Sequence, residues 1–225
     1  MMQDALKAMV ARAALAYVRP GEIVGVGTGS TVDKFIDALG VLGAPMAGAV
    51  SSSNASSERL RAHGIRVFDC AEVGEIGVYI DGADEIDPNG CMVKGGGGAL
   101  TREKIVAAQS RQFICIADES KQVPVLGSFP IPVEIIPMAR GRITRQFAKM
   151  GARAQLRCVE GEPYVTDNGQ HILDVHGLQI EEPLAFEADV SQWPGVVCVG
   201  VFARQRANCC LLGTAGGVRT LNFEN

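Results

Sequence analysis

Short apolar segments that each run into a loop of glycine, serine or aspartate constrain the fold of this chain more than any other feature. The first, Ile23–Val26, is followed by Gly27-Thr28-Gly29-Ser30-Thr31 and then by apolar residues at helical spacing up to Leu39. Further segments of this kind lie at residues 47–50, 65–68, 77–80 and 113–117, with helical patterns between them. Strands that alternate with helices predict an α/β fold with an open, mostly parallel sheet flanked by helices.

The pattern changes after Pro130, where we expect a second domain. Strands are predicted at residues 132–136, 154–158, 171–175 and 195–199, and helices at 139–150 and 182–190. This β-α-β-β-α-β order is typical of a small ferredoxin-like α+β sandwich. A further apolar strand at 208–213 is expected to return to the first sheet. We therefore predict a large α/β domain formed by residues 1–128 and 203–225, and a small α+β domain formed by residues 129–202.

Charge and cysteine usage argue against several classes of function. The net charge is −4, so the chain lacks the basic balance of a nucleic-acid-binding protein. Its seven cysteines include no Cys-x-x-Cys pair, which predicts reduced, mostly buried thiols in a cytoplasmic protein. Residues 1–20 form an amphipathic helical pattern that carries Asp4, Lys7 and Arg12. We therefore expect neither a signal peptide nor a membrane partner.

The glycine loop after the first strand has the form of a phosphate-binding site. A strand, a glycine loop and a helix together offer backbone N–H groups and the positive end of the helix to an anion. Ser30 and Thr31 can add hydroxyl donors, although a tight structural turn is the alternative. A dinucleotide fingerprint fails, because Ser30 stands where Gly-x-Gly-x-x-Gly requires glycine and no acidic residue follows about twenty residues later.

Two aspartates follow the strand predicted at residues 77–80, in the segment Asp81-Gly82-Ala83-Asp84-Glu85. Asp81 and Asp84 are separated by small residues, so both could face a ligand lying on the loop, accept hydrogen bonds from its hydroxyls and move protons. Clustered carboxylates also suit magnesium, and aspartate is a common helix cap. The spacing leaves these three interpretations open.

Four consecutive glycines, Gly95 to Gly98, follow Lys94. Such a run is costly unless the backbone must adopt positive φ or approach a ligand closely, and the apolar segments on both sides argue against a flexible linker. Lys94 could stabilise an enolate oxygen or bind a phosphate, while Glu103 falls on the helix that follows. Lys121, after the strand at 113–117, is either a second phosphate-binding cation or a surface lysine.

Taken in order, these segments resemble the type A ribose-5-phosphate isomerase family. The matching pieces are the glycine loop at 25–31, Ser51-Ser52-Ser53, the Asp81 to Glu85 segment, the stretch from Lys94 to Lys104, and Ser120-Lys121. The resemblance implies a two-domain homodimer or homotetramer that interconverts D-ribose 5-phosphate and D-ribulose 5-phosphate in the non-oxidative pentose phosphate pathway, without cofactor or metal. Cys209-Cys210 and Ala215-Gly216 depart from the pattern expected of the family.

The resemblance also assigns roles to residues. Glu103 matches the general base that moves a proton between C2 and C1 through an enediol, and Lys94 matches the group that stabilises the enediolate oxygen. Asp81 and Asp84 match the pair that binds hydroxyls and helps to open the furanose ring. Contacts with the substrate or its phosphate are implied for Lys7, Thr28, Gly29, Ser30, Thr31, Gly82, Ala83, Gly95, Gly96, Gly97 and Lys121. The competing interpretations are a sugar-phosphate-sensing regulatory module, which needs no base, and an acyl-CoA transferase, which needs a nucleophilic glutamate and a larger cleft.

Overall fold

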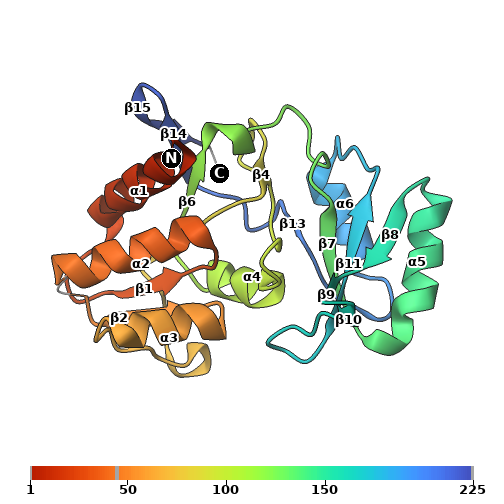
Figure 1. Cartoon of the computed structure of the whole chain (residues 1–225), viewed down its shortest axis with the longest axis horizontal. Coiled ribbons are helices and arrows are strands. Elements are labelled where there is room, and N and C mark those ends of the chain that lie inside the picture. The colour runs from red at the N-terminus through yellow and green to blue at the C-terminus, as the bar shows by residue number, and fades with distance from the viewer. Residues whose placement is uncertain (1, 44–45, 224–225) are drawn as a thin grey trace. The chain divides into compact units, whose positions relative to one another are not determined.

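The structure, a computed structural model, describes residues 2–43 and 46–223. The chain forms two compact units (Figure 1). Unit 1 comprises Met1–Ala83, Arg102–Gln122 and Ala207–Asn225, and unit 2 comprises Asp84–Thr101 and Val123–Arg206. Each unit has its own sheet and its own core of buried apolar side chains.

Unit 1 is built on a six-stranded sheet in the order β15-β14-β6-β3-β1-β2. Its strands are β1 (Ile23–Val26), β2 (Gly48–Ser51), β3 (Val78–Asp81), β6 (Phe113–Asp118), β14 (Cys209–Thr214) and β15 (Gly217–Asn222). Neighbouring strands from β2 to β14 are parallel, with Val24 opposite both Ala49 and Val78, whereas β15 is antiparallel to β14. The predicted open, mostly parallel sheet is confirmed, and β14 is the strand that was expected to return to it.

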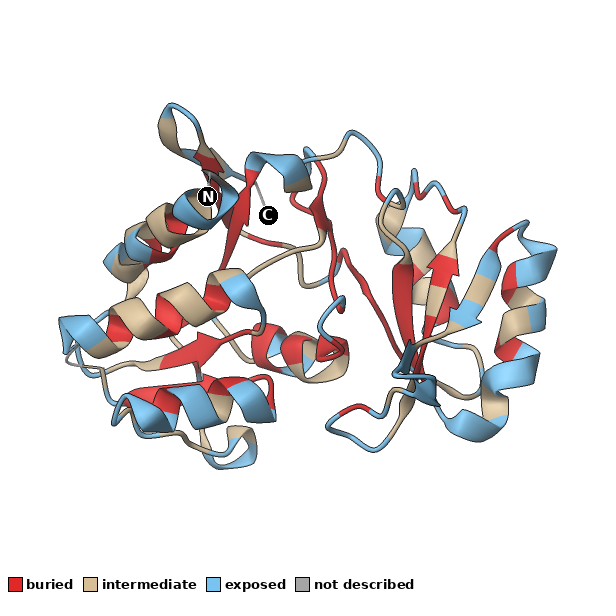
Figure 2. Ribbon diagram, in the orientation of Figure 1, coloured by how far each residue is buried: buried red, intermediate tan, exposed pale blue. Residues whose placement is uncertain are grey.

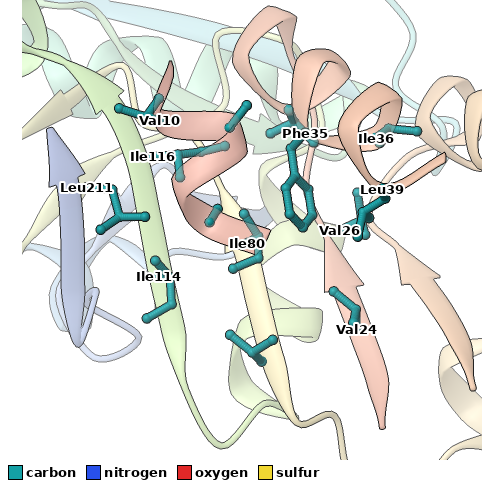
Figure 3. Packing of buried hydrophobic residues seen from close by; sticks show 14 of the residues in the cluster. Val10, Val24, Val26, Phe35, Ile36, Leu39, Ile80, Ile114, Ile116 and Leu211 are labelled. Carbon is teal, nitrogen blue, oxygen red and sulfur yellow. The ribbon is translucent and has the colours of Figure 1, made fainter. Parts of the chain in front are cut away.

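One face of this sheet forms the main core of unit 1. The helices of the unit are α1 (Met2–Ala14), α2 (Ser30–Leu42), α3 (Asn54–Ala62) and, from Arg102 onward, α4 (Leu100–Ala108). Figure 3 shows Val10 of α1 and Phe35 of α2 packed over Ile80 and Ile116 of the sheet. In α2 the buried residues Val32, Phe35, Ile36 and Leu39 recur at helical spacing, which explains why the sequence pattern located this helix.

The opposite face of the sheet packs against α4. Gly25 of β1 lies on this face, where an added Cβ would be 2.9 Å from both Tyr79 Cδ2 and Val106 Cγ1. Tyr79 is fully buried, and its ring centroid is 4.8 Å from that of Phe113. Strands β3, β6 and β14 are buried along almost their whole length (Figure 2). Because both faces are covered, these segments are apolar throughout instead of alternating.

Unit 2 contains a four-stranded antiparallel sheet in the order β12-β7-β11-β8. Its elements are β7 (Ile131–Ile135), α5 (Arg140–Lys149), β8 (Arg153–Leu156), β11 (His171–His176), α6 (Pro183–Val190) and β12 (Val196–Val199). The order of strands and helices follows the predicted β-α-β-β-α-β pattern, so the ferredoxin-like expectation is confirmed. Phe147 of α5 is buried in the core of this unit, where its ring centroid is 4.9 Å from that of Trp193.

Smaller elements explain a difference from the predicted domain division. They are the hairpin β9 (Cys158–Val159) with β10 (Glu162–Pro163), the sheet β13 (Val201–Phe202)-β5 (Met92–Val93)-β4 (Glu85–Ile86), and the 3-10 helices η1 (Leu15–Tyr17), η2 (Cys70–Glu72), η3 (Glu119–Lys121) and η4 (Pro137–Ala139). We predicted residues 84–101, 123–128 and 203–206 as part of the large domain. They group with unit 2, in which the central strand β5 pairs with β4 on one side and with β13 on the other.

The strand predicted at residues 65–68 is wrong. Among the described residues, this segment makes a single parallel bridge, Val67 to Ala49. It lies beyond β2 at the edge of the sheet, where its backbone makes two hydrogen bonds with Ala49, one through Arg66 O and one through Phe68 N–H. Strand β15 was not predicted, since its polar, partly exposed residues give only a weak pattern.

The expectations about thiols and membranes can also be compared with the structure. All seven cysteines are free thiols, of which Cys91, Cys115, Cys198, Cys209 and Cys210 are buried, Cys70 is half-buried and Cys158 is exposed. The prediction of mostly buried thiols is confirmed. Cys209 and Cys210 lie in β14, so this departure from the family pattern falls within the sheet of unit 1. No helix in the described part of the chain is both long and apolar enough to span a membrane.

Buried glutamates fix the loops of unit 2 by accepting backbone N–H groups. Glu85 of β4 accepts from Gly127 N–H at 2.7 Å and from Phe129 N–H at 2.5 Å. Glu187 of α6 accepts from Ala203 N–H and Arg204 N–H, both at 2.9 Å. A buried carboxylate held in this way satisfies both itself and the donors that would otherwise be left without water.

Glu85→Ala should lower the free energy of unfolding of unit 2 by about 2–5 kcal/mol, because it removes the acceptor of two N–H groups. The exposed Glu181 gives a matched control, for which Glu181→Ala should change the free energy of unfolding by less than about 0.5 kcal/mol. Urea titration followed by the fluorescence of Trp193, the single tryptophan, measures both. Equal unfolding midpoints for the two variants would contradict the assigned role of Glu85.

Candidate active site

The sheet of unit 1 has a switch point between β1 and β3. From β1 the chain continues through α2 to β2 on one side, whereas β3 pairs with the other side of β1. Open α/β sheets bind ligands beyond the carboxyl ends of the strands at such a point. Gly27 and Thr28 follow β1 directly, and Asp81 is the last residue of β3. Two of the predicted motifs therefore meet at the position where this kind of sheet binds ligands.

Asp81 joins the two loops at the switch point. Its side chain is fully buried, and Oδ1 accepts from Thr28 N–H at 3.1 Å and from Gly82 N–H at 2.7 Å. Its Oδ2 accepts from the Tyr79 hydroxyl at 2.5 Å. Position 27 requires glycine, because a Cβ there would lie 1.9 Å from Asp81 Cγ. The Asp81 carboxylate and the absence of a side chain at Gly27 thus set the distance between the loops after β1 and β3.

Glu103 lies in the first turn of α4 and is buried. Its charge reaches the same tyrosine: the pKa of the Tyr79 hydroxyl is raised well above its ordinary value, first by burial and then by the negative charges of Asp81 and Glu103. Two carboxylates therefore lie near one phenol in a region with little water. Charges interact more strongly there than at the surface, which favours proton transfer and the stabilisation of developing charge.

The glycine loop after β1 opens helix α2. Gly29 is the N-cap residue, with φ of 112° and no side-chain cap hydrogen bond, and both Gly29 and Ser30 are exposed. The first N–H groups of α2 therefore face an exposed loop, an arrangement that suits an anion. Lys7 of α1 donates to Ser30 Oγ at 2.9 Å. A predicted phosphate-binding cation thus lies beside a predicted phosphate-binding hydroxyl.

The second predicted cation, Lys121, belongs to η3 after β6. Asp118 caps this turn by accepting from Ser120 N–H at 3.1 Å and from the Ser120 hydroxyl at 2.5 Å, and it also accepts from Gln3 Nε2 at 3.3 Å. Burial raises the pKa of Asp118, but the hydrogen bonds and the charge of Lys121 outweigh burial and leave the pKa lowered. Helix α1 therefore contacts both predicted phosphate-binding segments: Gln3 contacts Asp118 beside η3, and Lys7 contacts Ser30 in the loop after β1.

The serine segment at 51–53 supports the first loop from β2. The hydroxyls of Ser52 and Thr28 are hydrogen-bonded at 3.0 Å, and the Ser56 hydroxyl donates to Gly27 O at 2.8 Å. Ser53 caps α3 by accepting from Ser56 N–H at 3.1 Å. Because Ser52 and Ser56 are buried, their hydroxyls stabilise the shape of the glycine loop.

In unit 2, Lys94 follows β5 directly and is only 3% exposed. Its backbone N–H donates to Gly200 O at 2.8 Å, and its ammonium nitrogen lies 5.5 Å from the centroid of the Phe202 ring. A compact positive charge that is buried stabilises a neighbouring anion more strongly than an exposed lysine would.

Asp84 holds the glycine run that follows Lys94. Its Oδ2 accepts from Gly96 N–H at 2.7 Å, and a Cβ on Gly96 would lie 2.6 Å from Asp84 Oδ1. Gly95 and Gly98 have φ of 108° and 85°. The positive φ expected in this run is confirmed at Gly95 and Gly98, and at Gly96 the backbone approaches the Asp84 side chain closely. Gly96 and Gly97 are exposed, so the loop faces solvent.

Each unit brings together part of the predicted site. In unit 1, Lys7 contacts Ser30, and Asp81 contacts Thr28 and Gly82. In unit 2, Asp84 contacts Gly96. The other predicted site residues lie in the same units: Gly29, Thr31, Ala83, Glu103 and Lys121 in unit 1, and Lys94, Gly95 and Gly97 in unit 2. Two other carboxylates of this region have structural partners: Glu85, described above, and Asp87, which accepts from Asn89 N–H and Cys91 N–H at 2.8 Å each. Within residues 2–43 and 46–223, no three His, Cys, Asp or Glu side chains are grouped so as to hold a metal ion.

Comparison with known proteins identifies the family to which this chain belongs. The family model of ribose 5-phosphate isomerase A (phosphoriboisomerase A) matches residues 48–217. Ribose-5-phosphate isomerase A of Polaromonas sp. (strain JS666 / ATCC BAA-500) is 69% identical to this chain over 227 residues, which cover 99% of the chain and 95% of that relative. The chain belongs to the ribose 5-phosphate isomerase A family.

Solved structures of ribose 5-phosphate isomerases share this fold over the whole chain. The crystal structure of ribose 5 phosphate isomerase A from Neisseria gonorrhoeae has a TM-score of 0.95 at 45% identity, covering 99% of this chain and 98% of that one. A D-ribose-5-phosphate isomerase in complex with phospho-erythronic acid has a TM-score of 0.94 at 35% identity, covering 99% of this chain and 100% of that one. The resemblance inferred from the motifs is therefore confirmed.

Sequence reasoning missed Tyr79, although a signal for it exists. Tyr79 stands two residues before Asp81 in the same strand, and the period of two in a strand places both side chains on one face. Arg157 and Tyr164, which contact the glycine run of unit 2, come from a distant part of the chain. No local pattern marks them.

The loss of stability at alkaline pH should depend on Tyr79. Because the pKa of Tyr79 is raised in the folded protein, its stabilising contribution is complete below pH about 10, the pKa in the unfolded chain, and is lost as the pH rises further. Above that pH the wild type should lose stability more steeply than Tyr79→Phe, by up to about 1.4 kcal/mol per pH unit. Urea titrations on both sides of this pH measure the two slopes, and equal slopes would contradict the prediction.

Proposed function

We propose that this protein interconverts D-ribose 5-phosphate and D-ribulose 5-phosphate by moving a proton between C2 and C1 through an enediolate. Membership of the family supports the substrate and a place in the non-oxidative pentose phosphate pathway. The observation that carries the chemistry is Glu103, a buried carboxylate on the helix that follows the glycine run. A regulatory module that only binds a sugar phosphate would need no such base, so this alternative is not favoured.

The phosphate is assigned to the loop between β1 and α2. Exposed Gly29 and Ser30 offer backbone N–H groups at the start of α2, and Thr28, Ser30 and Thr31 carry hydroxyls there. Lys7, which already contacts Ser30, and Lys121 supply positive charge. The phosphate keeps its charge during the isomerisation, so these contacts stabilise substrate and transition state alike.

Glu103 is proposed as the base for the carbon-bound proton. In the open-chain aldose the carboxylate takes the proton from C2, the C–H electrons form the C1–C2 double bond, and the charge moves to O1. The proton held by Glu103 then returns to C1, and the proton of O2 passes to O1, so that O2 becomes the ketone oxygen and O1 a hydroxyl. One carboxylate thus serves as base and then as acid, a device that typically supplies about 10²–10⁴-fold of the acceleration.

The enediolate oxygens are assigned to Lys94 and the backbone N–H groups of Gly95 and Gly97, because the Gly96 N–H already donates to Asp84 Oδ2. A positioned ammonium and oriented amides stabilise an oxyanion without having to reorganise as the charge forms. A relative has been solved in complex with phospho-erythronic acid, which supports an enediolate intermediate for the family. That ligand carries a carboxylate as well as a phosphate, so it resembles an enediolate phosphate in having negative charge at both ends.

The hydroxyls of the sugar are assigned to the loop from Asp81 to Asp84. Asp84 is half-buried and adjoins the exposed Gly96, so its carboxylate suits a hydroxyl donor and the opening of the ring. Gly82 and Ala83 bring the backbone close by without bulky side chains. Direct contact of Asp81 with the sugar stays a prediction, because its oxygens already accept from Thr28, Gly82 and Tyr79.

Glu103→Gln should keep the fold and the affinity for the phosphate but lower kcat by about 10²–10⁴-fold, because the amide cannot accept the proton from C2. Formation of ketose from ribose 5-phosphate measures turnover. Glu58→Gln, an exposed glutamate of α3, is the matched control and should leave kcat unchanged. A Glu103→Gln enzyme with near-normal kcat would assign the base to another carboxylate, first of all Asp84.

Lys121→Ala should raise KM by about ten- to a hundred-fold and leave kcat nearly unchanged, because it removes a charge-assisted contact with a group that does not react. The exposed Lys149 provides the control, since Lys149→Ala removes the same charge from α5. Initial rates over a range of substrate concentrations separate the two constants. Unchanged KM with a collapse of kcat would mean that the phosphate is placed wrongly.

We also propose that the protein works in the cytoplasm as a homodimer or homotetramer. Free, mostly buried thiols suit a reducing compartment. Strongly exposed apolar residues, Val41 of α2 and Met138 of η4, offer surface that a second copy could cover. Light scattering of the purified protein would test the assembly, and a monomeric mass at working concentrations would refute it.

A further inference from the structure

Gly96 and Gly97 of the glycine run in unit 2 are exposed, yet the carbonyls of the run are held in place. The Arg157 guanidinium donates through one nitrogen, Nη1, to Gly95 O at 2.9 Å and to Gly96 O at 3.0 Å. The Tyr164 hydroxyl donates to Gly97 O at 3.4 Å. Two side chains therefore bind three consecutive carbonyls of the segment to which the enediolate was assigned.

Both the side chain and the backbone of Arg157 are held by hydrogen bonds. Its Nε and Nη2 donate to the two carboxylate oxygens of Asp174 at 2.9 and 2.5 Å, a bidentate pair in which the Arg157 side chain is 14% exposed. Its backbone N–H donates to Ile172 O at 2.9 Å, and Tyr164 N–H donates to Arg157 O at 2.9 Å. The guanidinium is thus anchored to β11 and directed at the glycine run by a rigid fork of donors.

Holding a carbonyl also sets the direction of the next N–H group. In a trans peptide the C=O of one residue and the N–H of the next point in opposite directions within one plane. With Gly95 O on Arg157, the Gly96 N–H points away from it and meets Asp84 Oδ2 at 2.7 Å. With Gly96 O on the same guanidinium, the Gly97 N–H likewise points away from Arg157.

We propose that Arg157 is a positioning residue for the isomerisation. By binding Gly95 O and Gly96 O, it aims the Gly97 N–H at the enediolate oxygen and holds Asp84 in line with the sugar hydroxyls. This inference rests on the function proposed above. Arg157 is assigned no contact with the substrate. It acts through the Gly96–Gly97 peptide, whose N–H is assigned to the enediolate oxygen, and through the Gly95–Gly96 peptide, whose N–H holds Asp84.

The chemistry of the side chain explains why arginine stands here. Its planar fork binds Asp174 with two nitrogens while the third holds both carbonyls. Lysine has a single nitrogen on a flexible stem and cannot keep all four contacts in one plane. Arg157→Lys should therefore retain the charge and lose the orientation of the loop.

Steady-state kinetics of Arg157→Lys and Arg157→Ala test the proposal. We expect kcat to fall by about 10- to 100-fold, since a small misplacement of transition-state contacts costs this much. KM should change by less than about three-fold, because the phosphate contacts are untouched. The pH at which kcat is half-maximal should not move, because arginine does not titrate in this range.

Arg59 provides a matched control in unit 1. It forms a bidentate pair with Asp37 at 3.0 and 2.6 Å but holds no loop. Arg59→Lys should leave kcat and KM unchanged. Circular dichroism and unfolding midpoints show whether the variants are folded.

The outcomes separate this inference from the proposed function. A wild type that forms no ketose from ribose 5-phosphate refutes the function itself. An active wild type with a folded Arg157→Lys that keeps its kcat, or that changes KM alone, refutes the positioning role and leaves the function standing. If the Arg157 variants fail to fold, Tyr164→Phe decides: loss of one neutral hydrogen bond to Gly97 O should lower kcat by about two- to ten-fold, and an unchanged kcat overturns the proposal.

Discussion

The arrangement of the loops in unit 1 depends on the buried carboxylate of Asp81. A fully buried charge is tolerated only when hydrogen bonds replace the water it has lost, and here Tyr79, Thr28 and Gly82 supply them. Because one side chain accepts from the loops after β1 and β3, the two loops keep a constant distance. The start of α2 and the end of β3 are thereby positioned before any substrate arrives, as preorganised catalysis requires.

In unit 2 the peptide groups of a loop are also held in place by a side chain, but the donor and acceptor roles are reversed. In unit 1 an acidic side chain accepts from backbone N–H groups, whereas at the glycine run a basic side chain donates to backbone carbonyls. In both places a side chain holds the peptide groups in one orientation. Glycine residues by themselves would leave these groups too much conformational freedom. The division of labour also explains why Glu85 and Asp87 take no part in the proposed chemistry: each already accepts backbone N–H groups.

Periodicity and loop composition predicted the two sheets, because β1, β3, β6 and β14 are short, apolar and buried on both faces. The same reasoning failed at the edges, where residues 65–68 make one bridge and β15 is partly exposed. The compact units differ from the predicted division at residues 84–101, because β4 and β5 are two residues long and β5 pairs with β13, more than a hundred residues away. In the site, the motifs located the groups proposed for substrate, while Arg157 and Tyr164 depend on tertiary contacts that leave no trace in local spacing.

The position of β14 has a consequence for the order in which the protein can be completed during synthesis. This strand lies inside the sheet of unit 1, between β6 and β15, yet it follows all the residues of unit 2 along the chain. On the ribosome the small antiparallel sheet therefore has every strand available while the larger sheet still lacks two, β14 and β15. Until residues 209–214 emerge, β6 presents an open apolar edge, which is the kind of surface that pairs with other chains. The nascent protein needs protection at that edge, although the finished one does not.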